Sequence, residues 1–468
     1  MPEYTPKYFQ TYSPRVRVLV KDLETAQVLY DISDDLTSIS TNKAYGRCSG
    51  TWQLMLPYRK WQRFGDEYVG YMDVLQPNQM LTVEMDAGNG AGFFPVMCGM
   101  IDRVSAVRQG GDVPQRAVKV SGRDMGKLLE THDVAFDIIA YNKGLADADL
   151  VAQNGGTIPN TRVSREWDRT HDSGSAGTII RKVFDITMKN DMRTVKRVRF
   201  NDFTNDLWMV WNPNKSNTQG TPFWQYVKQI EHRPFNVLTT DTNHQNVDWF
   251  EIVLERYPYD PQNGALTRTN QPITGYTYWH TIGDTEIVSE DLGVSDQERV
   301  NLLSYQPAMN IQGQIMSYDV MMAHPDLTRW DKDDILINGL CPQVFVDNFT
   351  PPEMEDLYDA DPANQRKASE TAKGATDTLW NWYRNNHTYE SGSVVVHLRP
   401  DIRVGNGLLI QQLDGSYKEY LVEQVSHQCV FNPRPQFFTT LQLTRGQKAI
   451  PRNAENAGKP QPVTKATP

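Results

Sequence analysis

Alternating apolar and polar side chains mark the first third of the chain as strand-forming. Residues 15–20 place three valines on one face and two arginines on the other, which is the pattern of a half-buried strand. Four further segments have a similar strand-forming pattern, and we predict strands at 49–56, 80–85, 93–104 and 116–122.

A glycine-rich run, Gly88-Asn-Gly-Ala-Gly92, separates two of these strands. A dinucleotide-binding loop would need a helix after it, but residues 93–97 continue as a strand. Glycine also supplies the positive φ angles of tight hairpin turns. We therefore predict a hairpin turn at this run.

Helical spacing replaces the alternation after residue 122. The clearest helix is predicted at 173–190, where Ile180, Val183 and Phe184 recur at spacings of three and four. A threonine cap followed by proline predicts a second helix from residue 222, which the proline at 234 ends. Two more helices are predicted at 124–140 and 363–386, whereas residues 142–172 are polar and lack a usable period.

Strands return in the second half of the chain. We predict them at 235–238, 248–256, 393–398, 408–410, 419–425 and 438–443, and a disordered tail after residue 450. The order is β, then α, then β with a helical insertion, then β. This order predicts a β-rich α+β fold.

Composition and charge narrow the classes of function. The chain has 468 residues, enough for about two to four domains. Its net charge is -10, which disfavours a DNA reader that neutralises phosphates but permits a pore through which DNA slides. No stretch has the length of a membrane-spanning apolar helix, and the first residues lack the features of a secretion signal.

The four cysteines, Cys48, Cys98, Cys341 and Cys429, are far apart and form no CxxC pair. This spacing favours folding in a reducing compartment and buried thiols that pack as small hydrophobic groups. A zinc site built from His427, Cys429 and a distant partner is the alternative.

The search for catalytic motifs finds no HExxH, GxSxG, Walker or EF-hand pattern. Tryptophans at 208 and 211, with Trp224 and Trp249, are candidates for stacking on sugars, but we expect Trp224 and Trp249 to be core residues. We predict no catalytic residue, no metal and no cofactor. A cell-wall hydrolase, motivated by the acidic, tryptophan-rich middle region, is the enzymatic alternative.

One dense basic cluster contains Arg193, Lys196, Arg197 and Arg199. On a strand, its three arginines would lie on one face. A solvated sheet edge that discourages aggregation explains this pattern without a ligand. The sharper hypothesis is a contact with an acidic neighbouring subunit.

Four strand blocks, in chain order, resemble the tail hub proteins of bacteriophages, including the late-control-D-like hubs and the baseplate hub of contractile tails. The blocks cover most of the chain and lie at 75–129, 224–258, 287–302 and 403–446. Residues 142–172 and 312–386 do not match the family pattern.

The resemblance implies two tube-like β-barrel domains with helical and mixed accessory domains. The implied boundaries are 1–130 for the first barrel, 131–245 for a mixed α/β domain, 246–310 plus 391–450 for the second barrel, 311–390 for an inserted segment, and 451–468 for a disordered tail.

The function implied by the resemblance is structural. A homotrimer would form a ring that adapts the six-fold tail tube to the three-fold central spike and lines the DNA channel. The implied partners are the tail tube protein, the spike protein, the tape-measure protein and other baseplate proteins, in a virion tail assembled in the host cytoplasm. An acidic lumen would let DNA pass, in keeping with the net charge. The alternatives are a tail-associated form of the cell-wall hydrolase named above and the hub of a contractile injection system.

Overall fold

The computed structural model describes residues 13–58, 60–62, 68–109, 115–132, 172–174, 176–185, 188, 197–202, 209–211, 222–228, 231, 236–256, 279–306, 326–346, 362–432 and 434–449.

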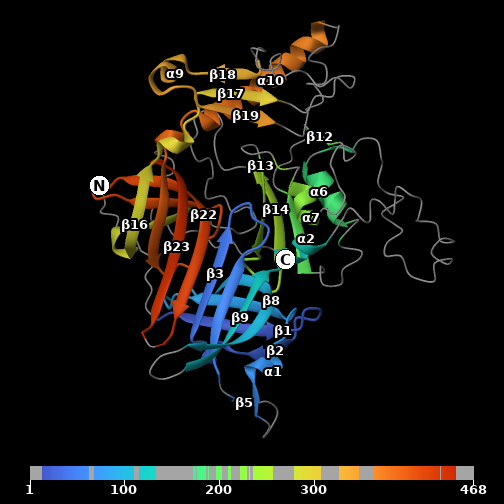
Figure 1. Cartoon of the computed structure of the whole chain (residues 1–468), viewed down its shortest axis with the longest axis vertical. Coiled ribbons are helices and arrows are strands. Elements are labelled where there is room, and N and C mark those ends of the chain that lie inside the picture. The colour runs from blue at the N-terminus through green and yellow to red at the C-terminus, as the bar shows by residue number, and fades with distance from the viewer. Residues whose placement is uncertain are drawn as a thin grey trace, which may run out of the picture.

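One large sheet unites strands from both ends of the chain (Figure 1). Its thirteen strands are β1 (Arg15–Lys21), β2 (Val28–Asp31), β3 (Ser38–Ala44), β4 (Thr51–Pro57), β7 (Met80–Asp86), β8 (Phe94–Gln109), β9 (Gln115–Asp124), β15 (Trp279–Ile282), β16 (Ile287–Val294), β20 (Glu390–His397), β21 (Gly407–Gln411), β22 (Tyr417–Val430) and β23 (Gln436–Lys448).

The strand order is β16-β20-β23-β22-β3-β4-β9-β8-β7-β1-β2, with β21 beside β22 and β15 beside β21. The predicted β-rich α+β class is confirmed. No sheet built from the described strands closes on itself, so the two tube-like barrels and their domain boundaries stay predictions.

The seam between the two halves of this sheet is the pair β22–β3. The pair is antiparallel and runs from Gln424 opposite Ala44 to Val430 opposite Ser38. The first part of the long strand β22 pairs with β21 instead. A single strand therefore holds the N-terminal and C-terminal strands in one continuous sheet.

Two apolar cores lie against this sheet because its strands alternate. The N-terminal core includes Val18, Leu54 and Leu81, and the C-terminal core includes Val396 and Leu441, all of them buried. On β22, Val425 belongs to the C-terminal core and Cys429 to the N-terminal core. Both cores therefore lie on the same face of β22.

The predicted hairpin turn between β7 and β8 is confirmed. Gly88, Gly90 and Gly92 have φ angles of 72°, 88° and 88°. A Cβ at Gly88 would also approach the backbone oxygen of Ser13 to 2.4 Å. The glycine run is thus required by backbone geometry.

A mixed α/β unit packs beside the N-terminal strands. Its elements are β11 (Val198–Asp202), β13 (Asn236–Thr242), β14 (Phe250–Arg256), α2 (Gly126–Thr131), α6 (Ala176–Phe184) and α7 (Phe223–Lys228). The helix predicted at 173–190 is confirmed in α6, where Ile180, Val183 and Phe184 are buried. Phe184 meets Phe223 edge to face, with 5.9 Å between ring centroids. Of the helix predicted at 124–140, residues 133–140 lie outside the described residues.

A smaller module lies above the main sheet in Figure 1. It consists of β17 (Leu302–Gln306), β18 (Thr328–Trp330), β19 (Pro342–Val346), α9 (Lys332–Asn338) and α10 (Pro362–Tyr383). The helix predicted at 363–386 is confirmed in α10, which buries Ala372 and Leu379 against Leu303 and Tyr305 of β17.

The remaining elements are short. They are β5 (Lys60–Gln62), β6 (Tyr68–Gly70), β10 (Asp172–Gly174), β12 (Met209–Trp211), α1 (Tyr71–Val74) and the 3-10 helices η1 (Ser33–Asp35), η5 (Asp284–Glu286), η6 (Asp296–Glu298) and η8 (Asn386–Thr388). Among the described residues, no helix has the length and apolar character needed to cross a membrane.

The cysteines are free thiols. Cys48, Cys98 and Cys429 are buried, as predicted, whereas Cys341 is half-buried. Burial raises the pKa of the Cys429 thiol to about 12. These three thiols therefore pack as hydrophobic groups.

Candidate functional site: an uncharged polar sheet face

The face of the main sheet that points away from the two cores is polar over its four central strands. β3 shows the reason, since Ile39 and Thr41 are buried whereas Ser40 and Asn42 are half-buried on the opposite side. The strand registers align equivalent residues across β23, β22, β3 and β4. We call these outward positions the polar face.

Cross-strand rows make up the polar face. One row contains Thr440, Ser426, Asn42 and Thr51, a second contains Phe438, Gln428, Ser40 and Gln53, and a third contains Gln442, Gln424 and Ala44. Val430, Ser38 and Met55 complete it. None of these side chains carries a charge, and most are hydroxyl or amide groups.

A hollow of about 450 Å³ lies over the centre of the polar face. Ser40, Asn42 and Gln53 line it together with Ser121 and Ser426, and the ion-paired Arg123 and Asp102 line its β9 end. Such groups donate and accept hydrogen bonds with water or with a passing molecule, but attract neither sign of charge.

At the β9 end of the face, Lys119 lies opposite Met55, and Arg123 is paired with two carboxylates. Arg123 donates from Nε to Asp102 Oδ2 at 2.9 Å and from Nη1 to Glu130 Oε2 at 3.0 Å. Lys127 Nζ lies 2.7 Å from Asp102 Oδ1. Burial raises the pKa of Asp102, but the hydrogen bonds from Arg123 and Lys127 outweigh it and hold that pKa below its ordinary value.

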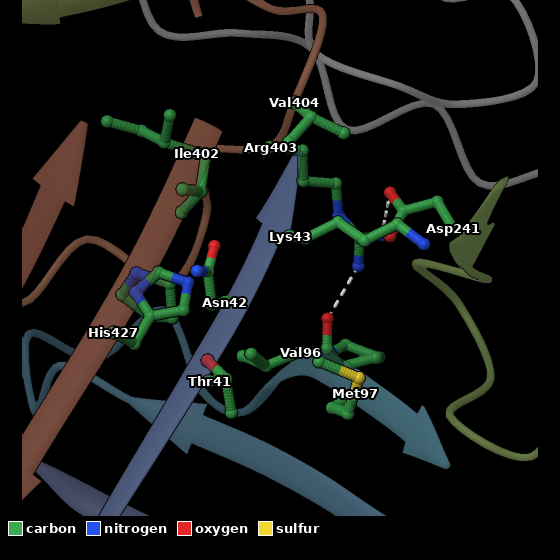
Figure 2. Close-up of a pocket in the computed structure, with 13 residues that line it drawn as sticks. Thr41, Asn42, Lys43, Val96, Met97, Asp241, Ile402, Arg403, Val404 and His427 are labelled. Carbon is green, nitrogen blue, oxygen red and sulfur yellow. Dashed lines mark hydrogen bonds and ion pairs between the residues drawn. The ribbon is translucent and has the colours of Figure 1, made fainter. Parts of the chain in front are cut away.

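Behind the polar face, Arg403 joins three parts of the fold (Figure 2). Its Nη1 lies 2.8 Å from Asp241 Oδ2 and donates to the carbonyl of Thr242 at 2.6 Å, both on β13. Its Nη2 donates to the carbonyl of Pro95 on β8 at 2.5 Å. A cavity of about 30 Å³, the space of one water molecule, lies beside it. Arg403 thereby fixes the C-terminal strands of the sheet to its N-terminal strands and to the α/β unit.

Lys43 of β3 makes a second buried link. Its Nζ donates to Asp124 Oδ2 at 2.5 Å, to Thr240 Oγ1 at 2.7 Å and to the carbonyl of Cys48 at 3.1 Å. Burial raises the pKa of Asp124, although Lys43 and the backbone N–H groups of Gly50 and Gly126 oppose that rise. The link aligns β3 with the α/β unit and so holds the polar face in position.

Of the predicted basic cluster, Arg193 and Lys196 lie outside the described residues. Arg197 is half-buried, and Arg199 is exposed on β11. The Arg199 guanidinium stacks 3.8 Å from the ring centroid of Trp249. The described arginines lie in the α/β unit rather than on the polar face, and their role in subunit contacts stays a prediction.

The two tryptophans expected in the core differ in burial. Trp224 is buried, as predicted. The prediction for Trp249 was wrong, because this residue precedes β14 and is only half-buried beneath Arg199.

The suggested zinc site contains His427. Its Nδ1 lies 2.9 Å from Thr439 Oγ1, within hydrogen-bonding distance. Among the described residues, no group of three or more potential ligands is arranged to hold a metal.

The sequence matches no protein-family model and no curated protein. The structure is similar to the 43 kDa tail protein of prophage MuSo2 from Shewanella oneidensis, with a TM-score of 0.50, 12% identity, and coverage of 94% of this chain and 99% of that chain. It is also similar to a tail protein from Neisseria meningitidis MC58, with a TM-score of 0.50, 11% identity, and coverage of 92% and 97%. The chain shares the fold of these two tail proteins. The expected likeness to phage tail proteins is confirmed at the level of the fold, and membership of the late-control-D-like hub family stays a prediction.

Proposed function

We propose that this chain is a structural protein of a phage-type tail, and that three copies form a ring whose channel is lined by the polar face. One observation carries the proposal: a continuous sheet of strands from both halves of the chain packs two apolar cores on one side and presents uncharged polar side chains from its four central strands on the other. The tail-protein fold supports it.

The chemistry of the polar face suits a channel through which a polyanion passes. Binding of DNA draws on cations that neutralise phosphates and release counterions. Over the four central strands, the serine, threonine, asparagine and glutamine side chains supply no such cation and no carboxylate that would repel phosphate, and at the β9 end Arg123 is paired with Asp102 and Glu130. We therefore propose that the four central strands give the channel an uncharged lining, in place of the acidic lumen suggested with the resemblance.

The ring would match the tail tube on one side and the central spike on the other. The proposed partners are those implied by the sequence resemblance: the tube, spike, tape-measure and other baseplate proteins, with DNA only as passing cargo. The proposed location is the virion tail, assembled in the host cytoplasm. A ring of this kind needs no catalytic group.

Site-specific gold labelling tests the channel lining. In a Cys341→Ser background, which removes the half-buried native thiol, Ser40→Cys is labelled with a maleimide gold cluster and imaged by negative stain. We expect the label inside the central opening of the ring. Ile337→Cys is the matched control, because residue 337 lies on α9 with 80% exposure and away from the polar face. Gold on the outer rim for Ser40→Cys would contradict the proposed lining.

A further inference from the structure

Among the strand edges of the main sheet that no other described strand covers, two belong to β16 and β8. β16 (Ile287–Val294) pairs only with β20. β8 pairs with β7 through residues 94–100 and with β9 through residues 99–109. Residues 102–109 of β8 therefore pair on one side alone, among the residues that the structure describes. Unpaired edges are templates for strand addition.

The two edges carry opposite charges. Glu290 and Asp291 are exposed on β16, and Arg103 and Arg108 are exposed on the unpaired part of β8. None of these four side chains forms an ion pair with another described residue. Complementary charge favours contact between the edges and disfavours contact of either edge with itself.

Each apolar core also ends at one of these edges with incompletely covered side chains. Leu292 of β16 is half-buried at the margin of the C-terminal core, and Val104 of β8 is half-buried at the margin of the N-terminal core. Val294 is 64% exposed on the same face as Leu292. A strand added at either edge would complete the burial of these aliphatic groups.

Strand direction permits the two edges to meet. Each of the seven steps from β16 through β20, β23, β22, β3, β4 and β9 to β8 is antiparallel. β16 and β8 therefore run in opposite directions within one chain. When β8 of one copy lies beside β16 of the next, the pairing is antiparallel, and the outward side of the sheet continues across the junction.

We propose that protomers join head to tail by pairing residues 102–109 of β8 with β16 of the neighbouring protomer. This inference rests on the proposed ring and names the surfaces that close it. The register that keeps core faces together places Glu290 opposite Arg108, Leu292 opposite Ala106, and Val294 opposite Val104. A head-to-tail interface that closes after three copies leaves neither edge exposed.

Charge reversal tests this pairing on the full-length chain. Glu290→Arg and Arg108→Glu each place like charges across the interface, and each should weaken trimer formation by roughly tenfold or more in sedimentation experiments. The double variant restores opposite charges and should recover most of the loss. Glu298→Arg, at an exposed position in η6, is the control and should not change assembly. Unaltered thermal unfolding of each variant monomer establishes that the fold is intact.

A disulfide tests the register. The proposed pairing places Gly293 opposite Ser105 on the outward side of the sheet, and nothing lies within 4 Å of the position that a Cβ at Gly293 would occupy. Oxidised Gly293→Cys/Ser105→Cys, in the Cys341→Ser background, should give covalent species of up to three chains. Gly293→Cys with Val28→Cys on β2 should give none.

The outcomes separate the two proposals. A trimer that is insensitive to both reversals and forms no disulfide would overturn the edge pairing while leaving the ring in place. A chain that stays monomeric at every concentration would contradict the ring and the pairing together.

Discussion

Protonation of His427 is expected to weaken the seam between the two halves of the sheet. His427 lies on β22 with 4% exposure and lines the cavity beside Arg403. Burial lowers its pKa from 6.5 to about 4, with an opposing effect of Asp401 and a supporting effect of Arg403. Lys43 and Asp241 line the same cavity.

The size of the effect follows from the two pKa values. The unfolded chain takes up a proton near pH 6.5, whereas the folded chain resists it until about pH 4. Stability from this group is therefore present above pH 6.5 and is lost as the pH falls toward 4. Because each pKa unit corresponds to about 1.4 kcal/mol, the loss amounts to about 3 kcal/mol.

The assay compares the wild-type chain with His427→Gln, whose amide can still bond to Thr439 and does not titrate. Urea unfolding is followed by tryptophan fluorescence at several pH values between the two pKa values. The difference in unfolding free energy between the two proteins removes contributions from other titrating groups. We expect this difference to shift by about 3 kcal/mol in favour of the variant as the pH falls.

A matched control is His397→Gln, because His397 is exposed on β20. The difference in unfolding free energy between His397→Gln and the wild-type chain should not change by a comparable amount as the pH falls. If the His427→Gln difference were constant with pH, His427 would be solvated or already charged at neutral pH. The described burial of His427 between β22 and the contacts of Arg403 would then be wrong.

Three further substitutions test other parts of the fold. Lys43→Met leaves buried Asp124 without its cation and should lower the unfolding free energy by about 3–5 kcal/mol. Because the pKa of Asp124 is already raised in the folded chain, this loss should become smaller as the pH falls toward the ordinary pKa of an aspartate and the carboxyl takes up a proton. Urea unfolding at several pH values measures the change. Trp249→Ala should cost only about 1–2 kcal/mol in urea unfolding, since the ring is half-buried and loses chiefly its contact with a guanidinium; a loss typical of a core aromatic would contradict this. Leu336→Ser with Ile337→Ser should leave the melting temperature unchanged, because these side chains are 75% and 80% exposed, and a large drop in calorimetry would show that they are packed.

The strands that alternate strongly were predictable from the sequence, as were the helices with regular apolar spacing. β1 repeats valine at every second position, and α10 repeats small and apolar residues on its inner side. Burial of one face requires this periodicity. The glycine turn was equally clear, because positive φ angles leave few alternatives to glycine.

β3 was not predicted, although it forms the seam of the sheet. Its inward positions are Ile39, Thr41 and Lys43, so only one of the three is apolar. Lys43 is buried because Asp124 and Thr240 lie beside it, and those partners are distant in the sequence. Apolar periodicity cannot reveal a strand whose inward side chains are polar and paired.

The polar face was also not predicted, because its side chains are uncharged and form no catalytic or binding motif along the chain. The alternation of Ser38, Ser40 and Asn42 in β3 is a weak signal by itself. It acquires meaning only when the registers align it with Ser426 and Gln428 of β22. Cross-strand alignment is a tertiary property, so no single segment contained this information.

The most direct test of the account is the native mass of the full-length chain, measured together with negative-stain images of the same sample. We expect a trimer that forms an open ring with a central channel and a near-six-fold outline. A compact monomer at every concentration, or a trimer without a central opening, would contradict it.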